Sequence, residues 1–538
     1  MTTGWMKVAL PGALLAAALA LADDDAPELF AVSDQCLACH NGLTDRAGYE
    51  VSIGSAWRPT MMAQSARDPY WQAGVRRETL DLPALQAAIE NECATCHMPM
   101  ARAEQRSVGQ QQPIFAALAA ARGREPARRD ALAVDGVACS ACHQIENARL
   151  GEPASFNGGF TVAALSPPAA RAVFGPFDVD TGRQRVMRSA TGYRPTRAPH
   201  VRSSELCATC HTLFTHALGT KGEVLGTLPE QVPYLEWKHS DYREAQSCQD
   251  CHMPAVAGPS PISSVLGQPR QPVLQHLFRG ANFLVPVLLN QQRGDLGVTA
   301  PAAELTLAQR HDVEHLQSSA AALTVHCGPI ADGVLTATVG VENRAGHKLP
   351  SAYPSRRAWL HVVVRDGSGV AVFESGALTA DGAIVGNDND NDNAAFEPHH
   401  RRIETPDQVQ IYETIMGRPD GSVTTGLLSA TQYLKDNRVL PSGFDKVTAP
   451  SDVAVRGDAA NDPDFEGGRD LVRYAVAVVK SGGPYQVQAE LWYQPIGYRW
   501  AHNLAAYDAV ETRRFVAAYR ASSAVSAALV TRAVADCR

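Results

Sequence analysis

The sequence predicts an α+β protein of several domains: a mostly helical, loop-rich domain, then an antiparallel β-sandwich, then a C-terminal helix. Three observations support this fold class. Residues 23–286 carry short helical patterns between loops marked by Gly and Pro, with little strand signal. Residues 323–506 contain short runs rich in Val and aromatic residues. Residues 507–538 are rich in Ala, with apolar positions at helical spacing.

Residues 1–22 have the pattern of a signal peptide. One lysine, Lys7, precedes an uncharged apolar run that ends in Ala20-Leu21-Ala22, a small-x-small cleavage site. The run is short for a membrane span, although an uncleaved anchor stays open. No later segment is apolar enough to cross a membrane. We therefore expect a mature chain without a membrane span, exported to the periplasm or the cell exterior.

The region 23–286 is defined by one short motif, Cys-x-x-Cys-His, which occurs five times. Two thiols at this spacing can attach one haem covalently, and the adjoining histidine then binds its iron. A single copy could instead be a redox dithiol or half of a zinc site. Five copies use ten of the twelve cysteines, so we predict five covalent haem c groups and a pentahaem domain. The motif residues are Cys36, Cys39 and His40; Cys93, Cys96 and His97; Cys139, Cys142 and His143; Cys207, Cys210 and His211; and Cys248, Cys251 and His252.

Residues 287–322 are predicted to form a helical connector, because Leu305, Leu307 and Leu316 recur at helical spacing, with His311 and His315 four residues apart on one face. Beyond it we predict six or more strands in the sandwich of residues 323–506, bounded by turns such as Asp366-Gly367. Their sequences are ALTVHC, VLTATVGVEN, AWLHVVVRD, VAVFES, LVRYAVAVV and YQVQAELWYQ. Residues 507–538 complete the chain as the predicted terminal helix.

Two cysteines, Cys327 and Cys537, lie outside the haem motifs. In an exported protein they are expected to form a disulfide between the terminal helix and the first strand of the sandwich. Two free buried thiols are the alternative.

Each iron of an electron carrier needs a second, distal ligand, usually His or Met. Twelve histidines remain after the five proximal ones, enough for five distal positions. Met61 and Met62 are competing ligands, and His361 falls within a strand pattern that favours a structural role. The five histidines that we select lie near the motifs or in loops of the sandwich, where a scaffold presents ligands: His200, His239, His276, His347 and His399.

The loop GNDNDNDN places Asp388, Asp390 and Asp392 at alternate positions. Such hard oxygen ligands suit calcium, but the glycine and final glutamate of an EF-hand loop are missing. A solvated acidic loop and a calcium site both stay open. The formal net charge of −8 without a basic tract argues against nucleic-acid binding.

Several segments resemble bacterial multihaem cytochromes c related to hydroxylamine oxidoreductase and to the tetrahaem cytochrome of ammonia oxidisers. They include SELCATCHTLF, YLEWKHSDYR, HLFRGANFL, VENRAGHKLPSAYPSRRAWLHV and YLKDNRVLPSGFDK. The resemblance implies electron transfer outside the cytoplasm through packed haems, with a β-sandwich behind. It implies no particular reaction, and two features depart from the relatives. All five motifs end in histidine, unlike pentahaem nitrite reductases, and five haems are fewer than the eight of hydroxylamine oxidoreductase.

Three functions are therefore weighed. The first is an electron carrier between other redox proteins or cytochromes, which we favour because no set of residues identifies a catalytic centre. The second is an oxidoreductase that acts on a small nitrogen or sulfur compound at one open haem. The third is an extracellular cytochrome that polymerises.

Overall fold

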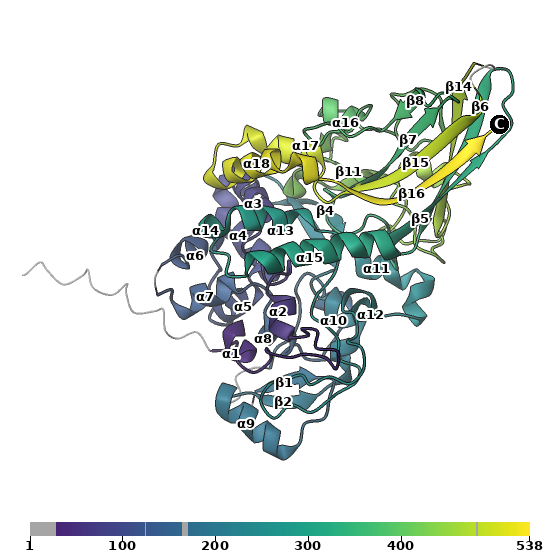
Figure 1. The fold of residues 1–538 in the computed structure, drawn as a ribbon. Coiled ribbons are helices and arrows are strands. Elements are labelled where there is room, and N and C mark those ends of the chain that lie inside the picture. The colour runs from purple at the N-terminus through teal and green to yellow at the C-terminus, as the bar shows by residue number, and fades with distance from the viewer. Residues whose placement is uncertain (1–27, 124, 164–170, 480–482) are drawn as a thin grey trace, which may run out of the picture.

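The structure is a computed structural model that describes residues 28–538 except 124, 164–170 and 480–482. It combines a helical, loop-rich N-terminal half with a β half (Figure 1). The long helix α15 (Ala302–His315) lies along both. The predicted α+β fold class is confirmed. The predicted signal peptide, residues 1–22, lies outside the described residues.

Short helices dominate the N-terminal half. The helix α3 shows why they form where they do: Asp68 caps it by accepting hydrogen bonds from the backbone N–H groups of Tyr70 and Trp71, and Pro69 occupies its first turn. The bounds are α1 Ser33–Leu37, α2 Ile53–Trp57, α3 Pro69–Asp81, α4 Gln86–His97, α5 Pro99–Ser107, α6 Ile114–Ala120, α7 Arg128–Val134, α8 Cys139–Cys142, α9 Thr181–Thr191, α10 Ser204–Ala208, α11 Pro233–Lys238 and α12 Cys248–His252.

Two small sheets in this half were not predicted. Strands β1 (Ala172–Gly175) and β2 (Arg194–Arg197) pair in parallel, and β3 (Leu213–Leu218) pairs with β4 (Val224–Gln231) in antiparallel fashion. Each is too short, or too poor in apolar alternation, to stand out in the sequence.

The connector contains three α-helices, α13 (Leu284–Gln291), α14 (Arg293–Leu296) and α15 (Ala302–His315). A π-helical turn, Leu316–Ala320, leads directly into the first strand of the β half. Leu305 and Leu316 are buried, as their spacing predicts, whereas Leu307 is exposed.

Two sheets pack face to face in the β half. One has the order β5-β6-β14-β9, and the other has the order β10-β7-β15-β16 with β8 also paired to β7. All six predicted strands are present. Their common core includes Leu335 and Val472 from the first sheet and Leu360 and Leu491 from the second. The strands are β5 Ala321–Cys327, β6 Val334–Asn343, β7 Arg357–Arg365, β8 Ala371–Ser375, β9 Arg402–Ile403, β10 Ile411–Tyr412, β14 Arg469–Ala477, β15 Tyr485–Gln494 and β16 Ala528–Cys537.

A third sheet, of order β12-β11-β13, lies beside the sandwich. Its strands are β11 Thr414–Gly417, β12 Val423–Thr424 and β13 Gln432–Asp436. None of them was predicted.

The C-terminal helix is shorter than expected. The helices α17 (Tyr498–Asn503) and α18 (Val510–Ala521) are followed by β16, which pairs with β15 along its length. The residues ALVTRAVADC are rich in Ala but alternate in burial, so an existing sheet edge decides their conformation. The predicted disulfide Cys327–Cys537 is confirmed, with 5.4 Å between the Cα atoms, and it joins β5 to β16.

The two halves are packed together chiefly through α3 and α18 (Figure 1). An ion pair joins Arg76 to Glu511 at 2.9 Å, and the buried Glu78 carboxylate accepts the backbone N–H of Leu427. Within the described ranges, no helix has both the length and the apolar character needed to cross a membrane.

Candidate functional site

The five Cys-x-x-Cys-His motifs all sit on short helices or at helix ends. The first and fourth motifs begin in α1 and α10 and continue past the end of those helices, the second ends α4, and the third and fifth begin α8 and α12. All ten motif cysteines are half-buried and carry free thiols. On one helical turn, two cysteines three residues apart point to the same side, and the following histidine is held next to them.

Four of the five motif histidines have their Nδ1 atom at a backbone carbonyl. His40 donates to Ile262 at 2.5 Å, His97 to Ser65 at 2.9 Å and His143 to Phe174 at 2.5 Å. His252 does the same to Arg279. A carbonyl can only accept, so Nδ1 must carry the proton and Nε2 keeps its lone pair. This is the tautomer that a histidine needs to bind a metal through Nε2.

Burial favours the neutral form of four motif imidazoles, those of His97, His143, His211 and His252. It lowers the pKa of His97 and of His252 to about 4, and it also lowers the pKa of His143 and His211. A neutral imidazole is the form that binds a metal ion.

Two motif histidines face a second imidazole at the separation that one iron requires. An imidazole nitrogen binds a transition metal at about 2 Å, so two imidazoles on opposite sides of one ion have centroids about 6 Å apart. The centroids of His143 and His276 are 6.3 Å apart at an interplanar angle of 26°. Those of His252 and His347 are 6.3 Å apart at 13°. These residues fit a haem with two histidine ligands at the third and fifth motifs.

His315 is a further imidazole at the fifth motif that the sequence interpretation missed as a ligand. Its ring centroid lies 5.9 Å from that of His252, at an angle of 62°. Ser319 donates its hydroxyl to the His315 carbonyl at 2.7 Å, so the hydroxyl oxygen, 3.0 Å from His315 Nδ1, accepts from Nδ1–H and leaves Nε2 with its lone pair. His315 is the last residue of α15 and directly precedes the π-helical turn. Such turns are often found at functional sites. The spacing of His311 and His315, four residues apart on one helix face, was the sequence pattern that could have identified His315 as a ligand.

Two other selected histidines lie near the motifs without facing a motif imidazole. His200 donates its Nε2–H to the carbonyl of Ile145 at 2.8 Å, which leaves only Nδ1 for a metal. His239, at the end of α11, donates Nδ1–H to Leu235 at 2.7 Å and keeps Nε2 free. Both are half-buried. His239 therefore has the tautomer of the motif histidines, and His200 has the opposite one.

The structure places His399 away from this arrangement, which corrects its selection. It is buried in the sandwich, and both of its ring nitrogens are used there. Nδ1 accepts hydrogen bonds from the amides of Gln410 (2.8 Å) and Asn437 (3.1 Å), and Nε2 lies 3.1 Å from Asp462. With two donors at Nδ1, the proton must be on Nε2. His399 is thus a hydrogen-bond donor to Asp462, and no lone pair is left for an iron.

The same proton assignment bears on the cluster that His399 forms with Asp462 and Asp470. The three groups lie close enough together to hold a metal ion. A metal on Nε2 would need the proton at Nδ1, where the two amides donate. The amides cannot be turned round, because Gln410 accepts the N–H of His400 and Asn437 accepts the N–H of Glu413 through their oxygens. The cluster therefore fits a neutral histidine bonded to a carboxylate.

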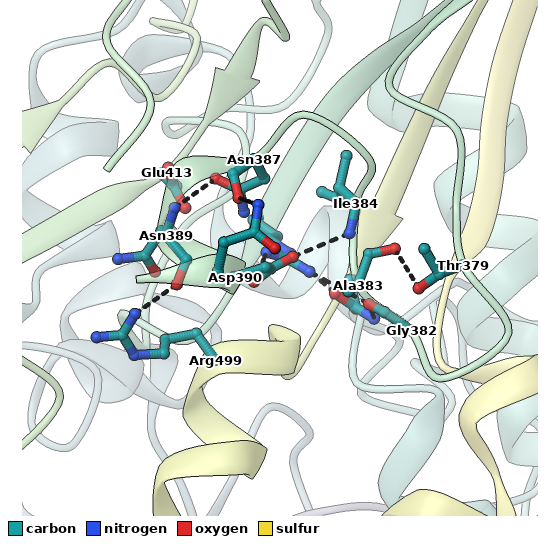
Figure 2. A network of polar contacts seen from close by, with 12 residues as sticks. Thr379, Gly382, Ala383, Ile384, Asn387, Asn389, Asp390, Glu413 and Arg499 are labelled. Atoms are coloured by element: carbon teal, nitrogen blue, oxygen red, sulfur yellow. Dashed lines mark hydrogen bonds and ion pairs between the residues drawn. The ribbon is translucent and has the colours of Figure 1, made fainter. Parts of the chain in front are cut away.

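The acidic loop is held by arginines (Figure 2). Asp390 points inward, where it pairs with Arg357 at 2.8 Å and accepts the N–H of Ile384 at 2.9 Å. Arg499 donates to the carbonyls of Asn389, Asp392 and Asn393, which a calcium ion would otherwise use. Asp388 and Asp392 are exposed. The loop residues do not fit a calcium site, because guanidinium groups already satisfy their inward-facing oxygens.

The motifs are neighbours in space, in an order that differs from their order in the chain. The Cys36 thiol lies within hydrogen-bonding reach of Cys139 and raises its pKa, so the first motif adjoins the third. Likewise the pKa of Cys96 is raised by Cys210, and that of Cys207 by Cys248. Packing of α1 on α8 and of α10 on α12 agrees with this. The fourth motif thus contacts both the second and the fifth.

The third and fourth motifs are also close. Burial and then the nearby Cys210 raise the pKa of the Cys142 thiol to about 12. All five motifs consequently form one connected group centred on the fourth.

The second motif differs from the others in its surroundings. His97 stacks on Trp71, with centroids 4.3 Å apart and an angle of 4°. Among the residues that the structure describes, it makes no ring contact with a second imidazole, and neither do His40 and His211. A hollow of about 430 Å³ lies beside this motif, lined by residues that include Asn91, Glu92, Arg102 and Arg106.

Comparison with solved structures shows a similar fold in another protein. The fold is similar to that in the crystal structure of a penta-heme cytochrome c552 from Thermochromatium tepidum, with a TM-score of 0.51 and 14% identity over 94% of this chain and 98% of that chain. No family model matches the chain, and no curated protein matches it either.

Proposed function

We propose that this chain is a pentahaem c-type cytochrome that carries electrons between redox partners outside the cytoplasm. The observation that carries the proposal is the shared geometry of the motif histidines. Four of the five donate Nδ1–H to a backbone carbonyl, so that Nε2 is free beside a pair of unoxidised thiols. The fold shared with a penta-heme cytochrome c552 supports it.

The residues of each motif have distinct tasks in this proposal. The two thiols form thioether bonds with the haem, and the histidine binds the iron. When bound, the haem supplies one-electron redox chemistry. The backbone carbonyls keep four of the five imidazoles in one orientation, which limits rearrangement during electron transfer.

The contacts between motifs support passage of electrons among all five sites. A path can run from the first motif to the third and the fourth, and branch there to the second and the fifth. The resulting network has three ends, so a partner could bind near any of them. The disulfide fits an oxidising compartment such as the periplasm.

The distal ligands that we propose are His276 for the third motif and His347 for the fifth, on the 6.3 Å separations given above. His347 comes from the β half, so the sandwich takes part in iron binding. His239 and His200 remain proposals for other motifs. His239 is the stronger of these because its Nε2 is free.

Intact mass of the denatured holoprotein tests the cofactor count. Five haems are expected to stay attached, and Cys139→Ala with Cys142→Ala is expected to remove one. Replacement of Ser140 in the same motif by Ala is the control, and it should retain all five. Four or fewer haems in the unaltered protein would contradict the proposal that every motif is used.

A second function, catalysis at an open iron, is favoured by one observation: a hollow of about 430 Å³ adjoins the second motif, and among the described residues no second imidazole makes a ring contact with His97. The hollow beside it contains Arg102 and Arg106, which suit a small anion. Under this alternative, the protein would turn over nitrite or a sulfur oxyanion, and Arg102→Gln would raise KM. If the protein turns over neither these compounds nor hydroxylamine, catalysis is ruled out and electron transfer is the function that is left.

A further inference from the structure

Four charged side chains are buried together where the helical half meets the β half. Glu236 comes from α11, Lys348 from the loop after β6, and Asp436 and Arg438 from the end of β13 and the residues after it. None of the four side chains is more than 6% exposed. We call these residues the boundary cluster.

Ion pairs connect all members of the boundary cluster. Lys348 Nζ lies 2.7 Å from Asp436, and Arg438 contacts Asp436 through two nitrogens at 2.7 and 2.8 Å. Arg438 also reaches the Glu236 carboxylate at 2.9 Å, across the boundary between the halves. Despite burial, Arg438 and Lys348 lower the pKa of Asp436 to about 2. Two positive and two negative groups leave the cluster with no net charge.

The Glu236 carboxylate additionally holds the backbone beside His347. Its Oε2 atom accepts the backbone N–H of Lys348 at 3.1 Å and the hydroxyl of Ser351 at 2.6 Å. His347 immediately precedes Lys348, and its Nδ1 lies 2.9 Å from the Lys348 carbonyl. The same peptide segment therefore donates two hydrogen bonds to the helical half and carries the imidazole that faces His252.

Stability alone does not account for such a cluster. Burying four charges costs solvation that their mutual attraction scarcely exceeds, and apolar residues of similar size often stabilise a boundary better. Charged networks do fix one relative placement of the groups that they join. Here the groups joined are α11 of the helical half and the loop that carries His347.

We propose that Glu236 is a positioning residue that, through the boundary cluster, sets the His347 imidazole opposite His252. The occupancy of the distal position at the fifth motif then depends on how the two halves are docked. This inference rests on the proposed function, because it takes His347 as an iron ligand.

The chain offers a matched control inside the β half. Glu413 is also a buried carboxylate paired with a buried lysine, Lys435, at 3.0 Å. The described contacts of Glu413 do not reach the His347 segment. Loss of Glu413 thus measures what removing a buried carboxylate does to stability in general.

The experiment compares full-length holoprotein with Glu236→Ala, Glu413→Ala and His347→Ala variants by electron paramagnetic resonance of the ferric form and by thermal unfolding. His347→Ala should convert one iron in five from low spin to high spin. Glu236→Ala should produce the same high-spin signal, whereas Glu413→Ala should lower the unfolding temperature with all irons low spin.

Ser351→Ala provides a milder variant in case Glu236→Ala does not fold. It removes one hydrogen bond to Glu236 and keeps every charge. We expect carbon monoxide to bind the reduced protein at least several-fold faster at one iron. An unchanged rate of carbon monoxide binding in Ser351→Ala would overturn the inference. It would also be overturned if every iron stayed low spin in Glu236→Ala, or if Glu413→Ala gave the same high-spin signal.

Failure of the proposed function has a separate signature. If His347→Ala itself leaves every iron low spin, the ligand assignment is wrong. If the unaltered protein retains no haem, the cytochrome proposal is wrong. A high-spin signal in His347→Ala without one in Glu236→Ala overturns the positioning role alone.

Discussion

Asp470→Asn is expected to stabilise the protein at neutral pH, although it alters a fully buried residue of the sandwich. Tyr412 donates its hydroxyl to one Asp470 oxygen at 2.7 Å, while the other oxygen, Oδ1, is buried without a hydrogen-bond partner. Burial raises the pKa of Asp470 to about 6. In the folded state the carboxyl therefore holds its proton to a higher pH than in the unfolded chain.

The sign and size of the effect follow from this difference. The unfolded chain releases the proton near pH 4, and the folded protein only near pH 6. The unfavourable contribution is thus absent below about pH 4, grows as the pH rises from about 4 to about 6, and is fully present above that. A pKa of about 6 against an ordinary 3.8 corresponds to about 3 kcal/mol of unfolding free energy above pH 7. Asparagine carries no charge and still accepts from Tyr412, so it should recover up to about that amount.

Urea unfolding of both proteins between pH 4 and pH 8, followed by near-ultraviolet circular dichroism, measures the difference. The control is Asp462→Asn. Hydrogen bonds from His399 and from the backbone N–H of Asp464, and then the charge of Arg401, lower the pKa of Asp462 in spite of its burial, so this variant should be destabilised at pH 7. The reasoning is refuted if Asp470→Asn is no more stable than the unaltered protein at pH 8, or if its advantage is the same at pH 4. Loss of a stoichiometric divalent metal in Asp470→Asn would show instead that the cluster binds one.

Three further outcomes are expected. Replacing Cys327 and Cys537 by Ser should lower the unfolding free energy of the sandwich by up to about 5 kcal/mol, as chain entropy predicts for a bridge across 210 residues, with haem content unchanged; a change below the error of urea unfolding would contradict this. Adding calcium or a chelator should leave the unfolding temperature unaltered, because Arg357 and Arg499 bind the oxygens of the acidic loop. A rise in the unfolding temperature at micromolar calcium would restore the interpretation of the loop as a calcium site. In the reduced protein, His276→Ala should add one site that binds carbon monoxide rapidly, and the absence of a new site would remove His276 as a ligand.

The parts of the fold that the sequence predicted are those with a local cause. Six strands of the sandwich follow from alternating β-branched and aromatic residues, and Cys327 and Cys537 were the two cysteines left over. The strand β16 was missed because ALVTRAVADC has helical composition, and only the open edge of β15 makes it a strand. Local propensity yields to tertiary pairing at such places.

The candidate site also divides into residues that a local sequence pattern identifies and residues whose surroundings depend on tertiary packing. The motif cysteines and histidines are contiguous, so their role was readable, and His276 and His347 were selected from their surroundings. His399 was selected for its loop, yet its environment is built by Gln410 and Asn437, which no local pattern connects to it. His315 was overlooked because its helix was interpreted as a connector, and its distance to His252 depends on how the halves pack.

The position of β16 in its sheet constrains how the protein matures. Strand β15 can pair with β7 as soon as both have been made, but its other edge has no partner until residues 528–537 arrive. In a chain that emerges from its N-terminus, that edge stays open longest, and an open edge invites pairing with other chains. The helical half, with its attachment sites, emerges earlier. Haem attachment can therefore begin before the sandwich closes, and a chaperone that shields the β15 edge during this interval would raise the yield of holoprotein.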